Sequence, residues 1–328
     1  MCEVMNNDKK FVNLKTSKNS IKKKILLTGG SGLVGRNIRE HSSADKWEIL
    51  APTRKELDLT DLSSVSQWVK KHQPDMIIHA AGLVGGIRAN IQNPVEFLDV
   101  NVSIGRNIIM VARDCNVTKL INLGSSCMYP ESINSPLTEE KLMAGKLEPT
   151  NEGYALAKLF TTKLCQYISN ENSNMHYKTL IPCNIYGKHD NFNLETAHLL
   201  PSIIHKIHTA KVINLNSVSV WGDGTARREF LYAGDLAEAI LLAAEDLHKI
   251  PNIMNIGFGL DYSVNEYYKI VAETLNWKGT WEHDLSKPAG MKQKLNDIER
   301  QRKWGWTAQT SLKIGIRKTY KHFLETLH

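Results

Sequence analysis

Short apolar runs rich in β-branched residues alternate with helical patterns along most of the chain, and this alternation restricts the fold more than any other feature. The runs are KILLT at 24–28, WEILA at 47–51, DMIIH at 75–79, KLINL at 119–123, KTLIP at 178–182 and NIMNIG at 252–257. Strands that alternate with helices form parallel βαβ units, since each helix returns the chain to the same end of the sheet. The sequence therefore predicts an α/β fold built on a doubly wound parallel sheet.

The alternation loosens near residue 187, where an Asn- and His-containing loop, a helix and a VSVWGDG strand follow. We predict a flexible basic leader at 1–22 and a dinucleotide-binding domain at 23–186 that also includes about 231–257. A smaller C-terminal substrate-binding domain is expected at 187–230 and 258–328. No repeat or low-complexity linker separates the two domains, so they are expected to enclose a cleft.

Composition excludes several classes of function. The net charge of +7 owes much to the lysine-rich leader, and no nucleic-acid motif accompanies it, so a small anionic ligand is a better match than nucleic acid. No apolar run approaches the roughly 18 residues of a membrane span, and no signal peptide is evident. We therefore expect a cytoplasmic protein. We also expect no metal, because its cysteines form no ligand-spaced cluster and no disulfide framework. They are Cys2, Cys115, Cys127, Cys165 and Cys183.

A glycine-rich turn follows the first predicted strand. In ILLTGGSGLVGRNIREH, Gly29, Gly32 and Gly35 have the spacing GxxGxxG between a strand and a helix. Glycines allow a sharp turn and a close approach to a pyrophosphate, which the free N–H groups of a helix N-terminus bind. A tight corner without a ligand is the alternative, but the position after the first strand favours a dinucleotide site.

The loop after the second strand indicates which dinucleotide is bound. It reads APTRKELDL and carries Arg54 and Lys55 where an acidic residue would bind the adenosine ribose hydroxyls. A guanidinium there pairs with a 2′-phosphate, so the sequence favours NADP(H) over NAD(H). Asp58 and Leu59 are expected beside the adenine. The alternative is that Arg54 is a solvated loop residue.

Tyr154 and Lys158 lie four residues apart in EPTNEGYALAKLFTTKL, hence on one face of a helix. An ammonium near a phenol favours the phenolate, so we expect the phenol's pKa to fall from about 10 toward neutrality. The tyrosine can then exchange a proton with a carbonyl or alcohol oxygen. Ser125, at the end of the fourth strand, is expected to hydrogen-bond the same oxygen. Combined with the glycine turn, the three residues indicate a hydride-transfer enzyme.

These residues together resemble the extended short-chain dehydrogenase/reductases, which have a Rossmann fold. The blocks HAAGLVGGIRAN, LGSSCMYP, LEPTNEGYALAK, NIYGKHDNF, VWGDGTARREFLY and KPAGMKQKL are similar to successive motifs of the GDP-L-fucose synthase family within them. The resemblance covers residues 23 to about 300. It implies an NADPH-dependent enzyme that epimerises C3 and C5 of a GDP-4-keto-6-deoxy sugar and reduces C4. It also implies a homodimer formed through two long helices.

The resemblance assigns Cys127 the role of base and His189 the role of acid in epimerisation. Hydrogens next to a C4 ketone are acidic because the carbanion is delocalised as an enolate. Inversion needs one group to remove a proton and another to return it to the opposite face. Ser125 and Tyr154 would hold the enolate oxygen. Taken alone, a cysteine at a strand end is more often a small buried hydrophobe, which is the alternative for Cys127.

The resemblance also implies the residues that bind the two ligands. It assigns to NADP(H) the residues Gly29, Ser31, Gly32, Leu33, Val34, Gly35, Arg54, Asp58, Leu59, Ala80, Ala81, Tyr154, Lys158, Pro182, Asn184, Ile185 and His189. It assigns to the GDP-sugar the residues Val84, Gly85, Gly86, Asn184, Trp221, Arg228 and Lys294. In this set the two cations would neutralise the pyrophosphate and the tryptophan would contact the nucleotide. A core tryptophan on a sheet is the alternative for Trp221.

Three features depart from the family pattern. Ala289 stands where an acidic residue is common, Lys188 stands where proline is usual, and the lysine-rich leader is extra. None removes a proposed catalytic group. They leave open a C4 reductase without epimerase function, acting on a related GDP-4-keto sugar such as a heptose in capsule or lipopolysaccharide assembly. A non-catalytic NADP-binding protein is disfavoured by the intact Ser125, Tyr154 and Lys158.

Overall fold

The computed structural model describes residues 22–133, 136–287 and 291–327. Residues 1–21 of the predicted leader lie outside the described residues, and so does Ala289. Within the described ranges no helix is long and apolar enough to cross a membrane. The same ranges contain no group of three or more His, Cys, Asp or Glu side chains placed to hold a metal ion.

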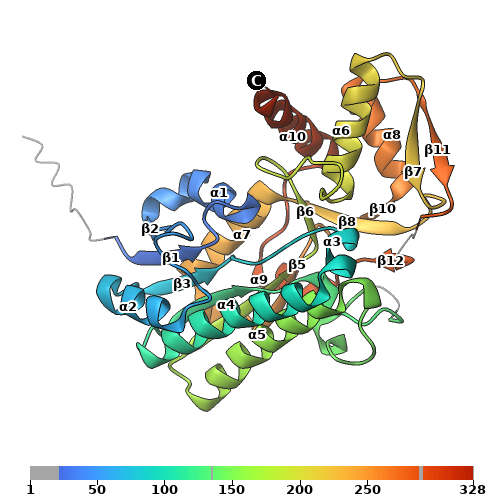
Figure 1. Ribbon diagram of the computed structural model, residues 1–328. Helices are drawn as coiled ribbons and strands as arrows, with labels where there is room; N and C mark the ends of the chain where they lie inside the picture. The colour runs from blue at the N-terminus through green and yellow to red at the C-terminus, as the bar shows by residue number, and fades with distance from the viewer. Residues whose placement is uncertain (1–21, 134–135, 288–290, 328) are drawn as a thin grey trace, which may run out of the picture.

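A six-stranded sheet forms the centre of the larger part of the molecule (Figure 1). Its strands are β1 (Lys24–Thr28), β2 (Glu48–Leu50), β3 (Met76–His79), β4 (Lys119–Leu123), β5 (His176–Pro182) and β9 (Ile253–Ile256). They lie in the order β2-β1-β3-β4-β5-β9, and every neighbouring pair is parallel. The six apolar runs all form strands of this sheet, which confirms the predicted fold class.

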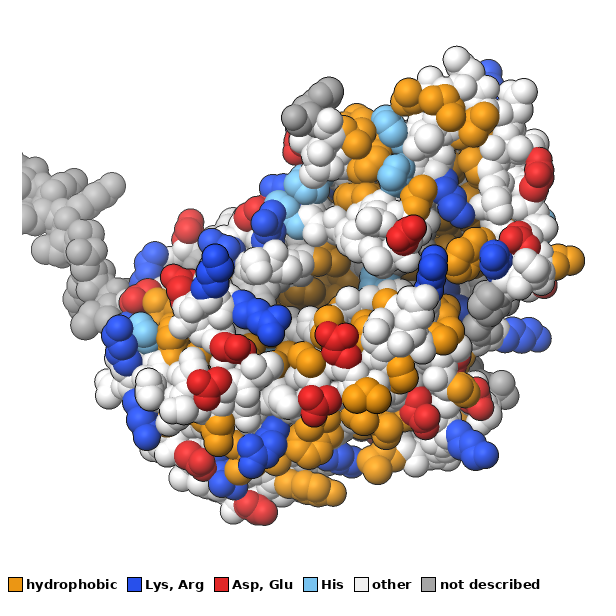
Figure 2. Space-filling model, viewed as in Figure 1, with side chains coloured by type: hydrophobic (Ala, Val, Ile, Leu, Met, Phe, Trp, Pro, Cys, Tyr) orange, Lys and Arg blue, Asp and Glu red, His pale blue; other side chains and the backbone are white. Residues whose placement is uncertain are grey.

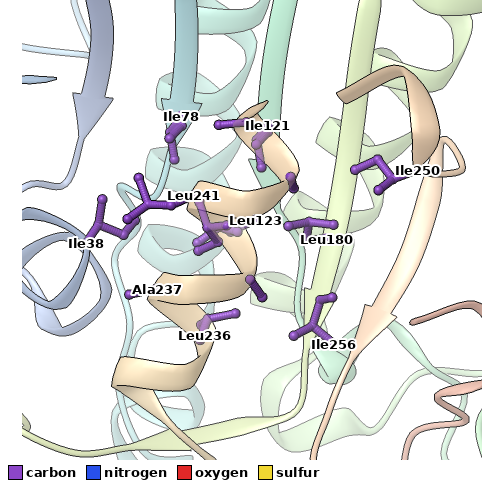
Figure 3. Close-up of a cluster of buried hydrophobic side chains, with 14 of the residues drawn as sticks. Ile38, Ile78, Ile121, Leu123, Leu180, Leu236, Ala237, Leu241, Ile250 and Ile256 are labelled. Carbon is purple, nitrogen blue, oxygen red and sulfur yellow. The ribbon is translucent and has the colours of Figure 1, made fainter. Parts of the chain in front are cut away.

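Helices cover both faces of the sheet because its strands are apolar on both sides. Leu26 faces a cluster with α2 (Leu62–His72), α4 (Pro94–Asp114) and α5 (Glu152–Glu171), whereas Ile25 and Leu27 face α1 (Leu33–Glu40) and α7 (Ala233–Glu245). Figure 3 shows Leu236, Ala237 and Leu241 of α7 directed at the strand side chains. Each fully buried leucine or isoleucine contributes roughly 1.5–3 kcal/mol, so packing holds these helices on the sheet.

The remaining elements form a second, smaller assembly around β8 (Arg227–Tyr232). This strand pairs in parallel with β6 (Asn184–Tyr186) and β12 (Gln293–Lys294), and antiparallel with β10 (Asp261–Ser263). A separate parallel pair joins β7 (Ser217–Trp221) to β11 (Thr280–Asp284). Three helices share an apolar cluster here: α6 (Leu199–Val212), α8 (Val264–Leu275) and α10 (Leu312–Thr326). A capping box between Ser263 and Glu266 begins α8.

Short helices complete the structure. The α-helices are α3 (Ile87–Gln92) and α9 (Glu299–Trp304). The 3₁₀ helices are η1 (Ser42–Lys46), η2 (Ser126–Met128), η3 (Glu139–Lys141), η4 (Pro149–Asn151) and η5 (Leu247–Lys249). Two of them, η2 and η4, lie at the site described below.

Two buried polar side chains join the large sheet to the smaller assembly. Asn255 of β9 accepts a hydrogen bond from the Tyr129 hydroxyl and donates to the carbonyl oxygens of Leu137 and Asp297. Glu229 of β8 accepts from the backbone N–H groups of Gly259 and Asn296. Burial raises the pKa of Glu229 to about 7. These bonds fix the segment around residues 294–297 against β8, and this segment reaches the site.

Candidate active site

The glycine turn after β1 forms a close-packed cradle. Gly29 has a φ of +73°, and a Cβ added there would lie 2.6 Å from the backbone nitrogen of Ala81. A Cβ on Gly35 would lie 2.2 Å from the carbonyl oxygen of Gly29. Gly32 is the N-cap of α1 and provides no side-chain cap for it. The glycine-rich loop thus leaves the backbone N–H groups at the start of α1 open to an anion, which fits a dinucleotide pyrophosphate.

Other residues predicted to bind the cofactor lie at the same edge of the sheet. Ala80 and Ala81 follow β3, Pro182 ends β5, and Asn184 and Ile185 lie in β6. The side chain of Asn184 donates to the Glu229 carbonyl oxygen at 2.9 Å and so ties β6 to β8. Beside the turn, Ser31, Leu33 and Val34 are exposed or partly exposed.

The loop after β2 presents Arg54 to solvent, as a 2′-phosphate ligand would require. Asp58 accepts two hydrogen bonds from Thr60, and these, together with the nearby charge of Arg54, lower its pKa. Leu59 is partly buried. A guanidinium near the predicted adenosine position therefore fits NADP(H).

Ser125, Tyr154 and Lys158 come together where β4 ends and α5 begins its second turn. The Lys158 ammonium donates to the Leu123 carbonyl oxygen at 3.0 Å and lies 5.8 Å from the centroid of the Tyr154 ring. Burial lowers the pKa of Lys158 to about 8. The predicted trio is therefore assembled at the carboxyl edge of the sheet, where ligands bind in open α/β folds.

The predicted lowering of the tyrosine's pKa is not found. Burial raises the pKa of Tyr154, the charge of Cys127 raises it further, and a hydrogen bond with Ser125 opposes both effects. The four-residue spacing of Tyr154 and Lys158 predicted an ammonium near the phenol. It could not show how strongly burial disfavours the charged phenolate. The phenol is accordingly protonated at neutral pH, which is the form that donates a proton.

Cys127 lies two residues after Ser125, in η2. Both side chains are partly accessible, whereas Ser126 and Met128 are buried. The Cys127 N–H donates to the Ser125 hydroxyl oxygen at 3.2 Å. Its sulfur accepts from the Asn151 side-chain amide at 3.5 Å and from the Lys294 ammonium at 3.9 Å. The thiol thus packs against the edge of an apolar cluster and also meets two hydrogen-bond donors.

His189 makes its contacts on another side of the site. Its Nε2 is 2.7 Å from Glu40 Oε1, and its Nδ1 is 3.4 Å from Arg36 Nη1. Its ring also meets that of His322 edge to face at 4.5 Å. Burial lowers the pKa of His189, and Glu40 opposes this shift. Both ring nitrogens therefore face α1, and no hydrogen bond joins His189 to Cys127 in the described part of the chain.

Figure 2 shows a hollow between the two parts of the molecule. Two of the cations predicted to bind the sugar nucleotide are neighbours in the smaller assembly. Arg228 of β8 pairs in register with Lys294 of β12. Trp221 is 50% exposed, with Lys287 over its ring at 5.8 Å, so it is not a core tryptophan.

The glycine loop predicted to border the sugar lies directly before α3. Val84 is 57% exposed. Next to it, Gly85 leaves room for the ring of Phe97, because an added Cβ would lie 3.0 Å from that ring. Gly86 lies close to the carbonyl oxygens that precede α6, since an added Cβ would lie 3.6 Å from those of Thr196 and Ala197.

Several residues that contact the predicted site residues were not themselves predicted, among them Asn151 and Glu40. Asn151 lies three positions before Tyr154 in the same sequence block, so its position offered a signal. Glu40 lies at the end of α1 and binds both His189 and Lys188, the latter at 2.6 Å. Nothing in the sequence around Glu40 indicates that partnership, although Lys188 was recognised as a departure from the family pattern.

Comparison with known proteins identifies the relatives of this chain. The sequence model described as the NAD dependent epimerase/dehydratase family matches residues 25–257. A GDP-L-colitose synthase of Yersinia pseudotuberculosis is 50% identical over 92% of this chain and 98% of its own. A GDP-L-fucose synthase of Azorhizobium caulinodans is 49% identical over 92% and 96%. The structure of a GDP-mannoheptose C4 reductase from Campylobacter jejuni with NADP bound has a TM-score of 0.85 at 27% identity, covering 93% of this chain and 99% of that one.

Replacing Arg54 with alanine should weaken NADPH binding much more than NADH binding. A charge-assisted phosphate contact is worth about 1.5–3 kcal/mol, so the Kd for NADPH should rise by roughly one to two decades. Titration of the full chain with each cofactor measures both constants, and Lys55→Ala removes the neighbouring exposed charge as a control. Equal losses for the two cofactors would remove Arg54 from the phosphate site.

Proposed function

The chain belongs to the NAD dependent epimerase/dehydratase family, and we propose that it is an NADPH-dependent oxidoreductase acting on a GDP-4-keto-6-deoxy sugar. The convergence of Ser125, Tyr154 and Lys158 beside the glycine cradle carries this proposal. The relatives named for GDP-L-colitose and GDP-L-fucose favour a 6-deoxyhexose substrate. We assign the cofactor to residues 23–186 with 231–257, and the nucleotide sugar to 187–230 and 258–328.

Reduction at C4 requires one proton for the ketone oxygen, and the chain supplies it from Tyr154. NADPH, when bound on the cradle of α1, supplies the hydride. The hydroxyls of Ser125 and Tyr154 lie within hydrogen-bond reach of each other. Each can donate its proton to the ketone oxygen instead when the substrate is bound. Lys158 lies one helical turn further on, and its ammonium stabilises the phenolate left after proton transfer. These residues thus stabilise the oxygen as it gains negative charge.

Epimerisation uses the same oxygen-binding residues with Cys127 as the base. The thiolate removes a proton from the carbon beside the ketone, and the electron pair is delocalised onto the oxygen held by Ser125 and Tyr154. A negative charge on Cys127 raises the pKa of Tyr154. The phenol of Tyr154 is therefore kept protonated beside a charged sulfur. The full proposal is an epimerase/reductase with His189 as the second proton-transfer group.

A C4 reductase without epimerase function is the second candidate. The contacts of His189 favour it, because Glu40 and Arg36 engage both ring nitrogens and would have to release the ring before it served as the acid. The resemblance to a GDP-mannoheptose C4 reductase points the same way. In this case Cys127 would remain in the cleft without taking part in the reaction.

We propose that the enzyme is cytoplasmic. Cys115, Cys165 and Cys183 are free thiols in the described part of the chain, as is Cys127. A reducing compartment keeps such thiols in this state.

Tyr154→Phe should abolish most of the C4 reduction while leaving NADPH binding nearly intact. The variant keeps the ring and its packing but removes the proton donor, and general acid catalysis contributes roughly 10²–10⁴-fold. Turnover is measured as NADPH consumption with GDP-4-keto-6-deoxymannose, and cofactor binding by titration. Retention of most of the turnover would mean that another group protonates the C4 oxygen.

Incubation in heavy water separates the two candidate functions. An epimerase/reductase should incorporate solvent deuterium at a carbon beside the ketone, which NMR of the product detects. Cys127→Ser replaces the base with a far weaker one, so exchange should slow by orders of magnitude while C4 reduction continues on the unepimerised sugar. His189→Asn should allow some exchange with little inversion.

Each outcome of the heavy-water experiment has one meaning. If wild-type protein reduces C4 without incorporating solvent deuterium, the second candidate function, a reductase without epimerase activity, is correct. Exchange that persists unchanged in Cys127→Ser would show that the thiol is not the base. Running GDP- and dTDP-linked sugars in parallel identifies the nucleotide.

We also propose a homodimer formed through α4 and α5. These helices of 21 and 20 residues pack side by side and carry apolar side chains that reach solvent. A second copy would cover them, as isologous interfaces do. The exposed side chains on the two helices are Val95, Leu98, Leu156, Phe160 and Tyr167.

Analytical ultracentrifugation should find wild-type protein at about twice the 37.0 kDa of one chain. Phe160→Glu should shift the protein to monomer, because it buries a charge in the proposed interface. Leu242→Glu changes a comparably exposed leucine on α7 and should not alter the mass. A wild-type monomer would exclude the homodimer.

A further inference from the structure

Lys294 is a buried cation that is held firmly beside Cys127. Its residue is 9% exposed, and its strand β12 pairs in register with β8. The flanking backbone is also bonded, since Leu295 accepts from the Leu137 N–H at 2.8 Å and Asn296 donates to Glu229 at 2.9 Å. The side chain of Lys294 therefore starts from a fixed backbone and reaches the sulfur of Cys127 at 3.9 Å.

The ammonium of Lys294 pairs with no carboxylate among the residues that the structure describes, and its hydrogen-bond partner there is the sulfur. A buried charge without a counter-charge is costly, and an anion beside it removes that cost. The thiol of Cys127 can become that anion by releasing its proton to solvent. Asn151 donates a second hydrogen bond to the same sulfur at 3.5 Å.

We propose that Lys294 is a positioning residue that holds Cys127 as the thiolate, so that the sulfur can accept a carbon-bound proton from the substrate. An ammonium within about 4–6 Å favours the ionised form of a neighbouring acid, and amide donors act in the same direction. When the thiolate takes the proton, the electron pair stays on the substrate as the enolate and the sulfur becomes a neutral thiol. The catalytic use of the thiolate rests on the proposed epimerase function, whereas its ionisation in the free protein does not.

This role differs from the phosphate contact that the family resemblance implies for Lys294. A phosphate ligand acts only when the nucleotide sugar is bound, so its loss would raise KM and leave the free protein's thiol unchanged. A thiolate partner alters the sulfur before any substrate binds. The chemistry of Cys127 in the substrate-free full-length protein therefore distinguishes the two roles.

The test is the rate of Cys127 alkylation by iodoacetamide between pH 5.5 and 9, read by peptide mass spectrometry so that the other cysteines do not interfere. Lys294→Gln should lower the rate at pH 6–7 by roughly tenfold or more, because an opposite charge at this distance changes ionisation by at least that factor. Lys294→Arg should restore most of the rate. Lys292→Gln removes an exposed lysine two positions earlier and should leave the rate unchanged.

Equal alkylation profiles for wild type and Lys294→Gln would overturn the proposal. A second measurement needs no Lys294 variant, in case that variant does not fold. The thiolate absorbance near 240 nm, taken as wild type minus Cys127→Ser, should rise at a pH below the ordinary thiol range of about 8.5. A rise only at or above that range would also overturn the proposal. Absence of deuterium exchange in a protein whose Cys127 is ionised would instead reject the epimerase function alone.

Discussion

The buried hydrogen bond from Lys158 to the Leu123 carbonyl oxygen joins the two elements on which the site depends. Leu123 ends β4, just before Ser125 and Cys127, and Lys158 lies one turn after Tyr154 in α5. Because an unpaired ammonium at 6% exposure would be costly, this bond helps to fix where α5 lies against β4. The strand-end hydroxyl and thiol are thereby placed beside the phenol, and every proposed chemical step uses that arrangement.

Cationic side chains converge on this point from both parts of the molecule. Lys158 lies in α5, which packs on the large sheet. Arg228 and Lys294 lie in β8 and β12 of the smaller assembly. Burial lowers the pKa of Lys158 to about 8 and also lowers that of Arg228. The anions of the proposed reaction are the pyrophosphate, the enolate and the thiolate. Charge placed in advance stabilises each of them without reorganising solvent.

Much of the fold and of the site could be predicted from sequence, for identifiable reasons. All six strands of the large sheet are apolar runs set off by helical patterns, and the glycine turn and the Tyr154–Lys158 pair are local. In the structure Tyr154 interacts with both Ser125 and Cys127. Strands β6, β10 and β12 span only two or three residues, too few for a periodic pattern, and they depend on pairing with β8. The contact of His189 with Glu40 joins residues 149 positions apart, which no local pattern encodes. Likewise, spacing showed an ammonium near Tyr154 but not the burial that raises its pKa.

Hydride delivery to a GDP-4-keto sugar is tested most directly with NADPH that carries deuterium at the transferable position of the nicotinamide. The reaction is run in ordinary water with GDP-4-keto-6-deoxymannose and related GDP-4-keto sugars, and the product is examined by NMR. Wild-type protein should place the deuterium at C4 of at least one of these sugars. A protein that binds NADPH but transfers no deuterium to any of them would contradict the proposed function and leave a dinucleotide-binding protein without this activity.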